Sequence, residues 1–181
     1  MTALPPSVTE AAPAPDPRKP TAVLLVGGYG GMGVHALLSI QRLFPGHFRN
    51  FVFVSVAVID AATMKGLEEV ERARAKAEHA LQQYVALAHR FRLPAEYRVA
   101  TGTDVLDAGV KVCEEVARTY PRSVFFLGKL IFERENVFQR LLHNETAYQL
   151  QQRLQFSGMN AMVLPVRVMD EAATISAEKV A

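Results

Sequence analysis

Five glycines follow the first apolar run of the chain, and they are the residues best suited to hold a ligand. Residues 26–33 read VGGYGGMG, in which Gly28, Gly30 and Gly33 fit the spacing G-x-G-x-x-G. Glycines at a strand-to-helix turn let backbone N–H groups approach a phosphate, and the helix N-terminus adds partial positive charge. The glycines predicted to contribute to this anion site are Gly27, Gly28, Gly30, Gly31 and Gly33.

The same glycine motif has two other interpretations. In one, the glycines only permit a tight turn and close packing of the helix on the sheet. In the other, they bind a dinucleotide, as in a small nicotinamide or flavin oxidoreductase, which also needs an acid about 20 residues on, at the end of the next strand. Ser55 lies nearer to that spacing and Asp60 comes late, so the oxidoreductase is the least favoured. A chain of 181 residues also lacks a second mononucleotide-binding half and a substrate domain.

A second polar cluster follows the fourth apolar run, where residues 128–136 read GKLIFEREN. In one interpretation of this cluster, Lys129 or Arg134 faces an anion. In the other, which the mixed charge favours, the cluster is a solvated surface on which Glu133 and Glu135 pair with basic neighbours. Further along, Asn144 is expected to cap a helix and Thr146 to point back toward the same crevice. The second half of the candidate site is therefore Gly128, Lys129, Arg134, Asn144 and Thr146.

No catalytic constellation is visible in the sequence. There is no G-x-S-x-G elbow, no Walker lysine follows the glycines, and the five histidines lack metal-ligand spacing. The lone Cys113 falls beside the inner face of a predicted helix and is expected to pack rather than to react. We therefore expect a binding protein, not an enzyme, with no metal site.

Composition excludes several other classes of protein. With 50% hydrophobic and 21% charged residues, the chain is expected to form one globular domain. Its single cysteine cannot form an internal disulfide, so a reducing cytoplasm is the expected compartment. Its 20 Lys and Arg are interleaved with 18 Asp and Glu, which argues against nucleic-acid binding. Residues 22–40 carry no Asp, Glu, Lys or Arg, but glycines interrupt the apolar run too early for a signal peptide or a membrane span.

Apolar runs alternate with segments of helical period, which predicts a parallel sheet covered by helices on both faces. The fold class is α/β, a doubly wound five-stranded parallel sheet of order 3-2-1-4-5, whose ligands bind outside the carboxyl ends of the first and fourth strands. The expected strands cover residues 21–27, 51–59, 95–101, 123–128 and 159–168. The expected helices cover residues 33–44, 67–91, 105–120 and 137–156, the last broken near His143 and Asn144.

The apolar spacing also predicts which helix faces are buried. The first helix is expected to bury Val34, Leu37, Leu38 and Leu43. The second is expected to bury a stripe that steps by three and four from Leu67 to Phe91. Thr103 or Asp104 is expected to cap the third.

Residues 1–20 hold six of the ten prolines and are expected to be a disordered leader or linker. The domain is expected over residues 21–168, and residues 169–181 form a polar tail. The last strand, Met159–Val168, must lie at an edge because Pro165 lacks an N–H donor. An apolar edge strand is an aggregation hazard, so we expect it to pair with a second copy in a homodimer or with a neighbouring module.

Strand order, chain length, the glycine after the fourth strand and the last apolar strand together resemble the universal stress protein superfamily over residues 21–168 or so. More specifically, residues 21–60 and 125–168 are similar to the soluble C-terminal domain that follows the membrane helices of some bacterial amino acid permeases of the amino acid–polyamine–organocation type. This resemblance implies a cytosolic regulatory or sensory module that is attached to the membrane domain of a transporter, or a free copy of one.

The resemblance also implies a nucleotide ligand, ATP or AMP, because many stress proteins bind one. Their signature is an Asp at the end of the first strand and G-x-x-G-(nine residues)-G-[S/T] after the fourth. Here Gly27 and Gly28 end the first strand and Ile131 takes the place of the second signature glycine, so that only Gly128 and Thr146 match. An ATP- or AMP-binding stress protein is therefore the alternative function.

Overall fold

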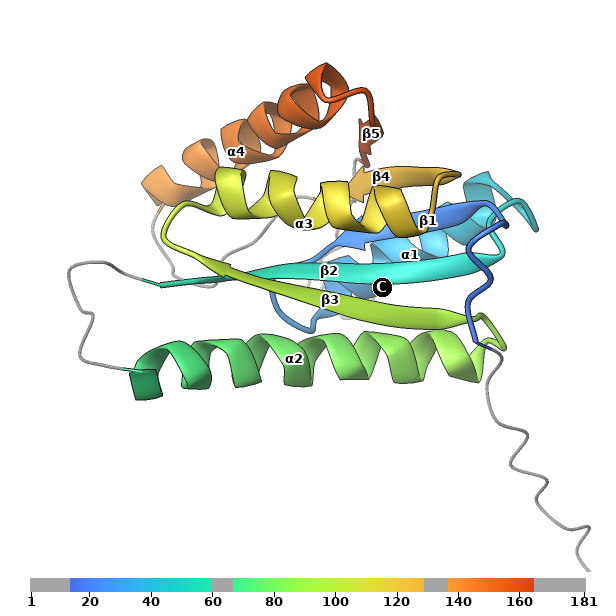
Figure 1. Ribbon diagram of the computed structural model, residues 1–181, viewed down its shortest axis with the longest axis horizontal. Helices are drawn as coiled ribbons and strands as arrows, with labels where there is room; N and C mark the ends of the chain where they lie inside the picture. Colours follow the sequence, from blue (N-terminus) through green and yellow to red (C-terminus); the bar gives the residue numbers. More distant parts are fainter. Residues whose placement is uncertain (1–13, 60–66, 129–136, 165–181) are drawn as a thin grey trace, which may run out of the picture.

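The computed structural model describes residues 14–59, 67–128 and 137–164, with the side chains of residues 137–144 outside the description. It contains a sheet of five parallel strands in the order β3-β2-β1-β4-β5, which confirms the predicted fold class (Figure 1). The strands are β1 (Thr21–Leu25), β2 (Asn50–Val58), β3 (Ala95–Gly102), β4 (Ser123–Leu127) and β5 (Asn160–Val163). The helices are α1 (Gly31–Leu43), α2 (Leu67–Arg90), α3 (Val105–Thr119) and α4 (Val137–Phe156).

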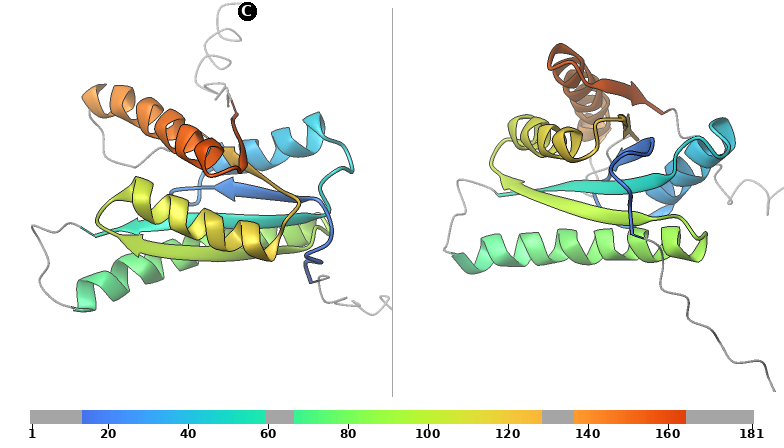
Figure 2. Two further views of the ribbon diagram at one scale, coloured as in Figure 1. Left: turned by 45° about the horizontal axis from the view of Figure 1, so that its top comes forward. Right: turned by 45° about the vertical axis from the view of Figure 1, so that its right-hand side comes forward.

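Helices cover both faces of this sheet (Figure 2). The first core layer packs α1 and α2 against one face, and the second packs α3 and α4 against the other. Strand β1 supplies both layers, because Ala22 and Leu24 point to the first while Val23 and Leu25 point to the second. A strand buried on both faces must be apolar throughout, which explains the continuous run that begins the domain.

The buried face of α1 differs from the predicted one. The helix buries Ala36, Leu37 and Ile40, whereas Leu38 and Leu43 remain 42% and 57% exposed. The cause is a close approach of the α1 backbone to α2 at Gly33, which turns the stripe formed by residues 33, 36, 37 and 40 toward the core. The prediction is correct for Leu37 and for the partly buried Val34, and it is wrong for Leu38 and Leu43, because the approach that orients the helix involves a residue without a side chain.

The expected stripe on α2 is correct only in the second half of the helix. Its buried residues are Ala80, Leu81, Tyr84 and Ala88. Leu67 is 82% exposed, since contact with the sheet is confined to the second half, and Phe91 is also exposed.

Asp104 caps α3, as predicted: its carboxylate accepts hydrogen bonds from the N–H groups of Leu106 at 2.8 Å and Asp107 at 3.0 Å. Cys113 is fully buried on the same helix, and this burial raises the pKa of its thiol to about 12. A thiol with that pKa stays protonated at neutral pH, which fits the packing role expected for it.

Helix α4 is continuous from Val137 to Phe156, so the break expected near His143 and Asn144 is wrong. Asn144 lies in the helix interior and cannot be its N-cap. Asparagine is a weak helix former but is tolerated inside a helix that is fixed by packing, as α4 is through the buried Leu150 and Leu154.

Strand β5 lies at the edge of the sheet, as predicted, and Leu164 continues its pairing through a hydrogen bond from its N–H to Leu127 O at 3.0 Å. Residues 165–168 of the expected strand lie outside the described residues. None of the described helices combines the length and apolar character needed to cross a bilayer.

The last part of the expected leader, residues 14–20, is held against the domain. The side chain of the buried Asn50 accepts a hydrogen bond from Asp16 N–H at 3.0 Å and donates to Asp16 O at 2.7 Å and Thr21 Oγ1 at 3.0 Å. Residues 14–20 therefore form a docked turn at the start of β1, while residues 1–13 lie outside the described residues.

Candidate functional site

The two loops predicted to form the site come together at the carboxyl edge of the sheet. Strands β1 and β4 are neighbours in register, with Leu25 opposite Leu127, so Gly27 and Gly128 leave the sheet side by side. Gly128 also lies against α1, since a Cβ atom added to it would be 4.0 Å from the Cβ of Ala36. Lys129 and Arg134 fall outside the described residues.

The glycine loop is held by a tyrosine that the sequence analysis placed only in the buried stripe of α2. The hydroxyl of Tyr84 donates a hydrogen bond to Gly28 O at 2.9 Å and accepts one from Gly30 N–H at 3.2 Å. Its ring stacks on Phe53 with centroids 5.3 Å apart and meets Tyr29 at 4.8 Å. Burial raises the pKa of the Tyr84 hydroxyl, which keeps it neutral and able to donate.

The glycines of the loop serve two different purposes. A Cβ atom at Gly33 would overlap the hydroxyl and ring of Tyr84, so this glycine permits close helix packing. At Gly28 and Gly30 an added Cβ would meet no atom within 4 Å, and at Gly31 it would meet only His35 at 4.0 Å. The packing interpretation therefore accounts for Gly33, and the exposed glycines remain open to an approaching ligand.

The N-terminus of α1 has neither a side-chain cap nor an acidic residue in its first turn. The first backbone bond of the helix runs from Val34 N–H to Gly30 O at 3.2 Å. The N–H groups of Gly31, Met32 and Gly33 precede that bond and have no acceptor within the helix. Such groups carry partial positive charge and favour an anion.

A small pocket lies beside this loop, lined by residues of β1 and β2, Val105 and Leu150. Its volume is about 20 Å³, which is room for a single water molecule. The Oγ of Ser55 donates to Gly27 O at 3.2 Å and fixes the strand end next to it. The described residues thus leave space for a ligand over the surface of the loop rather than inside this pocket.

The two predicted site residues on α4 lie on the other face of the sheet from α1. Ala147, Leu150 and Leu154 bury α4 against the α3 side. Thr146 is half-buried and lies one turn before Leu150, which lines the same pocket as Gly27. Asn144 lies about two turns inside α4, which begins at Val137, and its side chain is outside the described residues.

Within the described ranges, no three His, Cys, Asp or Glu side chains are grouped to hold a metal ion. Tyr84 is the site residue that sequence reasoning missed. Its place in the helical stripe predicted burial, but no local signal indicated that its hydroxyl reaches a loop more than 50 residues away.

Several solved structures are similar to this chain, and the following two are among them. A protein of the universal stress protein family from Burkholderia pseudomallei superposes with a TM-score of 0.53 at 20% identity, over 80% of this chain and 96% of that one. A universal stress protein in complex with cAMP gives a TM-score of 0.46 at 14% identity, over 81% and 98% of the two chains. No family model and no curated protein sequence matched. The first likeness shows that the chain has the fold of universal stress proteins.

Proposed function

We propose that this chain is a non-catalytic regulatory domain that binds a small phosphate-bearing ligand, with ATP and AMP as candidates, over the glycine loop between β1 and α1. The observation that carries the proposal is the uncapped N-terminus of α1, which presents the N–H groups of Gly31, Met32 and Gly33 at the carboxyl edge of the sheet. Parallel sheets of this kind bind ligands at that edge, where the strand order reverses.

The state of the loop supports binding without prior rearrangement. Tyr84 fixes the backbone of Gly28 and Gly30 through its hydroxyl, and the open glycines leave the amides uncovered. A loop that is already ordered loses less conformational entropy when a ligand arrives. Backbone amides bind charge but supply neither a nucleophile nor a general base, so this loop serves recognition rather than turnover.

A charge placed at Gly31 tests the site. Gly31→Asp puts a carboxylate in the first turn of α1, where it favours the helix but repels a bound phosphate. We expect the affinity for ATP or AMP to fall at least about tenfold in calorimetric titrations. Gly31→Ala is the matched control, because its Cβ has space, and we expect it to change the affinity less than about twofold.

Adenosine separates the phosphate contact from any contact with the base. Its binding should be unaffected by Gly31→Asp, because it carries no negative charge. The proposal is rejected if ATP, AMP and inorganic phosphate all fail to bind at millimolar concentration. It is also rejected if Gly31→Ala weakens binding as much as Gly31→Asp does.

The finer part of the proposal is that the domain regulates an amino acid transporter of the amino acid–polyamine–organocation type. Its support is the resemblance of residues 21–60 and 125–168 to the soluble domain of such permeases. In this function the transporter would respond to whether the ligand is bound at the glycine loop. The edge strand β5 would contact a second copy or the transporter.

Association through β5 is expected to appear as a homodimer of the isolated chain. Met162 is exposed on this edge strand, and an apolar edge left in water favours pairing. Sedimentation velocity at tens of micromolar should show a dimer for the wild type and a monomer for Met162→Lys. Leu67→Lys is the control, since Leu67 is exposed at the start of α2. A monomeric wild type, or a dimer that Met162→Lys leaves intact, contradicts this interface.

A further inference from the structure

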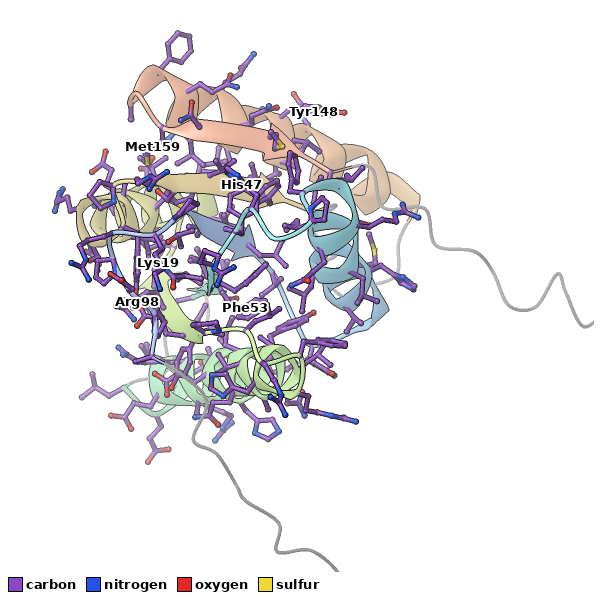
Figure 3. The ribbon with its side chains drawn as sticks, turned by 90° about the vertical axis from the view of Figure 1, so that its right-hand side faces the viewer. Lys19, His47, Phe53, Arg98, Tyr148 and Met159 are labelled. Carbon is purple, nitrogen blue, oxygen red and sulfur yellow. The ribbon has the colours of Figure 1, made fainter. Side chains whose placement is uncertain are left out.

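A second cavity lies at the amino-terminal edge of the sheet, at the opposite end of the strands from the glycine loop. Its volume is about 420 Å³, within the range of small-molecule sites. Three loops form it: the docked turn before β1, the connection from α1 to β2, and the connection from α2 to β3. Figure 3 looks onto this edge, with Lys19 to the left of the middle, between the labels of Met159 and Arg98.

The charged side chains of this cavity are mostly cationic. Lys19, Arg49 and Arg92 line it, and Asp16 is the one acidic residue among the lining residues. The Asp16 carboxylate is already bound by Arg18 Nε at 3.2 Å, and this hydrogen bond holds the pKa of Asp16 below its usual value. Among the described residues, neither Arg49 nor Arg92 forms an ion pair through its guanidinium. The cavity therefore has an excess of positive charge.

Most of the uncharged lining residues are apolar, and Gln41 and Asn50 are the polar ones. Phe44 and Phe48 contact each other with ring centroids 5.6 Å apart, and Leu93 and Pro94 face them from the third loop. The side chain of Asn50, also in the lining, makes three hydrogen bonds that tie the docked turn to β2. A site of this composition suits a ligand with an apolar body and one anionic head.

Arg92 lies in the turn that ends α2. Arg92 has φ of +57° and is the one residue other than glycine with positive φ in the described ranges. The turns after α1 and α4 use Gly46 and Gly158 for such conformations, at φ of +68° and +79°. Arg92 occupies the same kind of position after α2, where its N–H donates to His89 O at 2.9 Å and Leu93 N–H donates to Ala88 O at 3.0 Å, the two bonds of a Schellman motif. Glycine is the usual residue at this position, and the arginine that replaces it here is one of the residues that line the cavity.

We propose that the amino-edge cavity binds a small organic anion with an aromatic body, whose sulfonate, carboxylate or phosphate head is held by Arg49 and Arg92. Phe44, Phe48 and Leu93 contact the aromatic body. This site is independent of the glycine loop, because the two lie at opposite ends of the parallel strands.

The probe for this site is 1-anilinonaphthalene-8-sulfonate, whose fluorescence rises in apolar surroundings. We expect the full chain to bind one molecule, and Arg92→Gly and Arg49→Gln each to weaken binding about three- to fivefold. Arg92→Gly also removes the strained conformation, so the variant should fold at least as well as the wild type. The control is Arg72→Gln, which makes the same charge change on an exposed position near the start of α2 and should alter the affinity less than twofold or so.

Two further measurements separate the alternatives. The uncharged analogue N-phenyl-1-naphthylamine should bind with an affinity that neither arginine variant changes. Gly31→Asp should leave binding of the sulfonate probe intact, so that failure of the glycine-loop site and failure of this one are distinguishable. The proposal is overturned if Arg72→Gln lowers the affinity for the sulfonate probe as much as Arg92→Gly does. It is also overturned if Arg92→Gly and Arg49→Gln leave the affinity for the sulfonate probe unchanged.

Discussion

Replacing Gly33 with alanine is expected to lower the free energy of unfolding by about 3 kcal/mol, more than most single substitutions do. The new methyl group would overlap the buried Tyr84 side chain, which is packed between Phe53 and Tyr29 and cannot move aside without cost. Displacing Tyr84 also breaks its hydrogen bonds with Gly28 and Gly30. Urea denaturation followed by circular dichroism measures the change.

A matched substitution on the same helix separates this clash from a general effect of alanine. Gly31→Ala meets open space and should stabilise the protein by roughly 0.5 kcal/mol through its higher helix propensity. In a Tyr84→Ala background the clash is gone, so Gly33→Ala should then cost little, which corresponds to a coupling energy of about 3 kcal/mol between the two substitutions. An equal cost of Gly33→Ala in both backgrounds would mean that the glycine does not act through Tyr84.

The sheet was predictable because each strand has a pattern that can be recognised from its own residues. β1 is apolar throughout, as a strand buried on both faces must be, and Pro94 and Gly46 mark where α2 and α1 give way to the next strand. Right-handed crossovers then limit the strand orders to a few common ones, and the structure has one of these, β3-β2-β1-β4-β5. The cap at Asp104 was equally local, because a carboxylate that binds N–H groups two and three residues on needs no tertiary partner.

The orientation of the helices was less predictable, because it depends on contacts between distant segments. Apolar residues occur on several sides of α1, and the close approach at Gly33 selects the side with Ala36, Leu37 and Ile40. The same contact determines that the hydroxyl of Tyr84 meets the glycine loop. Helix periodicity reports which residues are spaced to share a face, but it does not report which face meets the sheet.

The amino-edge cavity could not be predicted from the sequence. Its three cationic residues come from three loops, separated by 30 and 43 positions along the chain, and none belongs to a motif. Composition of residues 1–20 predicted disorder, since six prolines and no large apolar cluster offer little to bury. Residues 14–20 are nevertheless docked, because hydrogen bonds to one buried side chain replace an apolar contact.

The buried side chain that holds this turn is that of Asn50. Asn50→Asp is expected to lower the free energy of unfolding by about 3 kcal/mol at neutral pH. Asn50 is 1% exposed, and its amide donates to Asp16 O and Thr21 Oγ1. Aspartate has the same shape but no donor, so the change removes both bonds and leaves a carboxylate buried.

Asn160→Asp is the control, because Asn160 is exposed at the start of β5 and the same change there should cost less than about 0.5 kcal/mol. Trypsin provides a local readout, since a released turn should be cut after Arg18 faster than in the wild type. If Asn50→Asp destabilises the chain no more than Asn160→Asp does, or leaves cleavage after Arg18 unchanged, then Asn50 does not hold the turn to the domain.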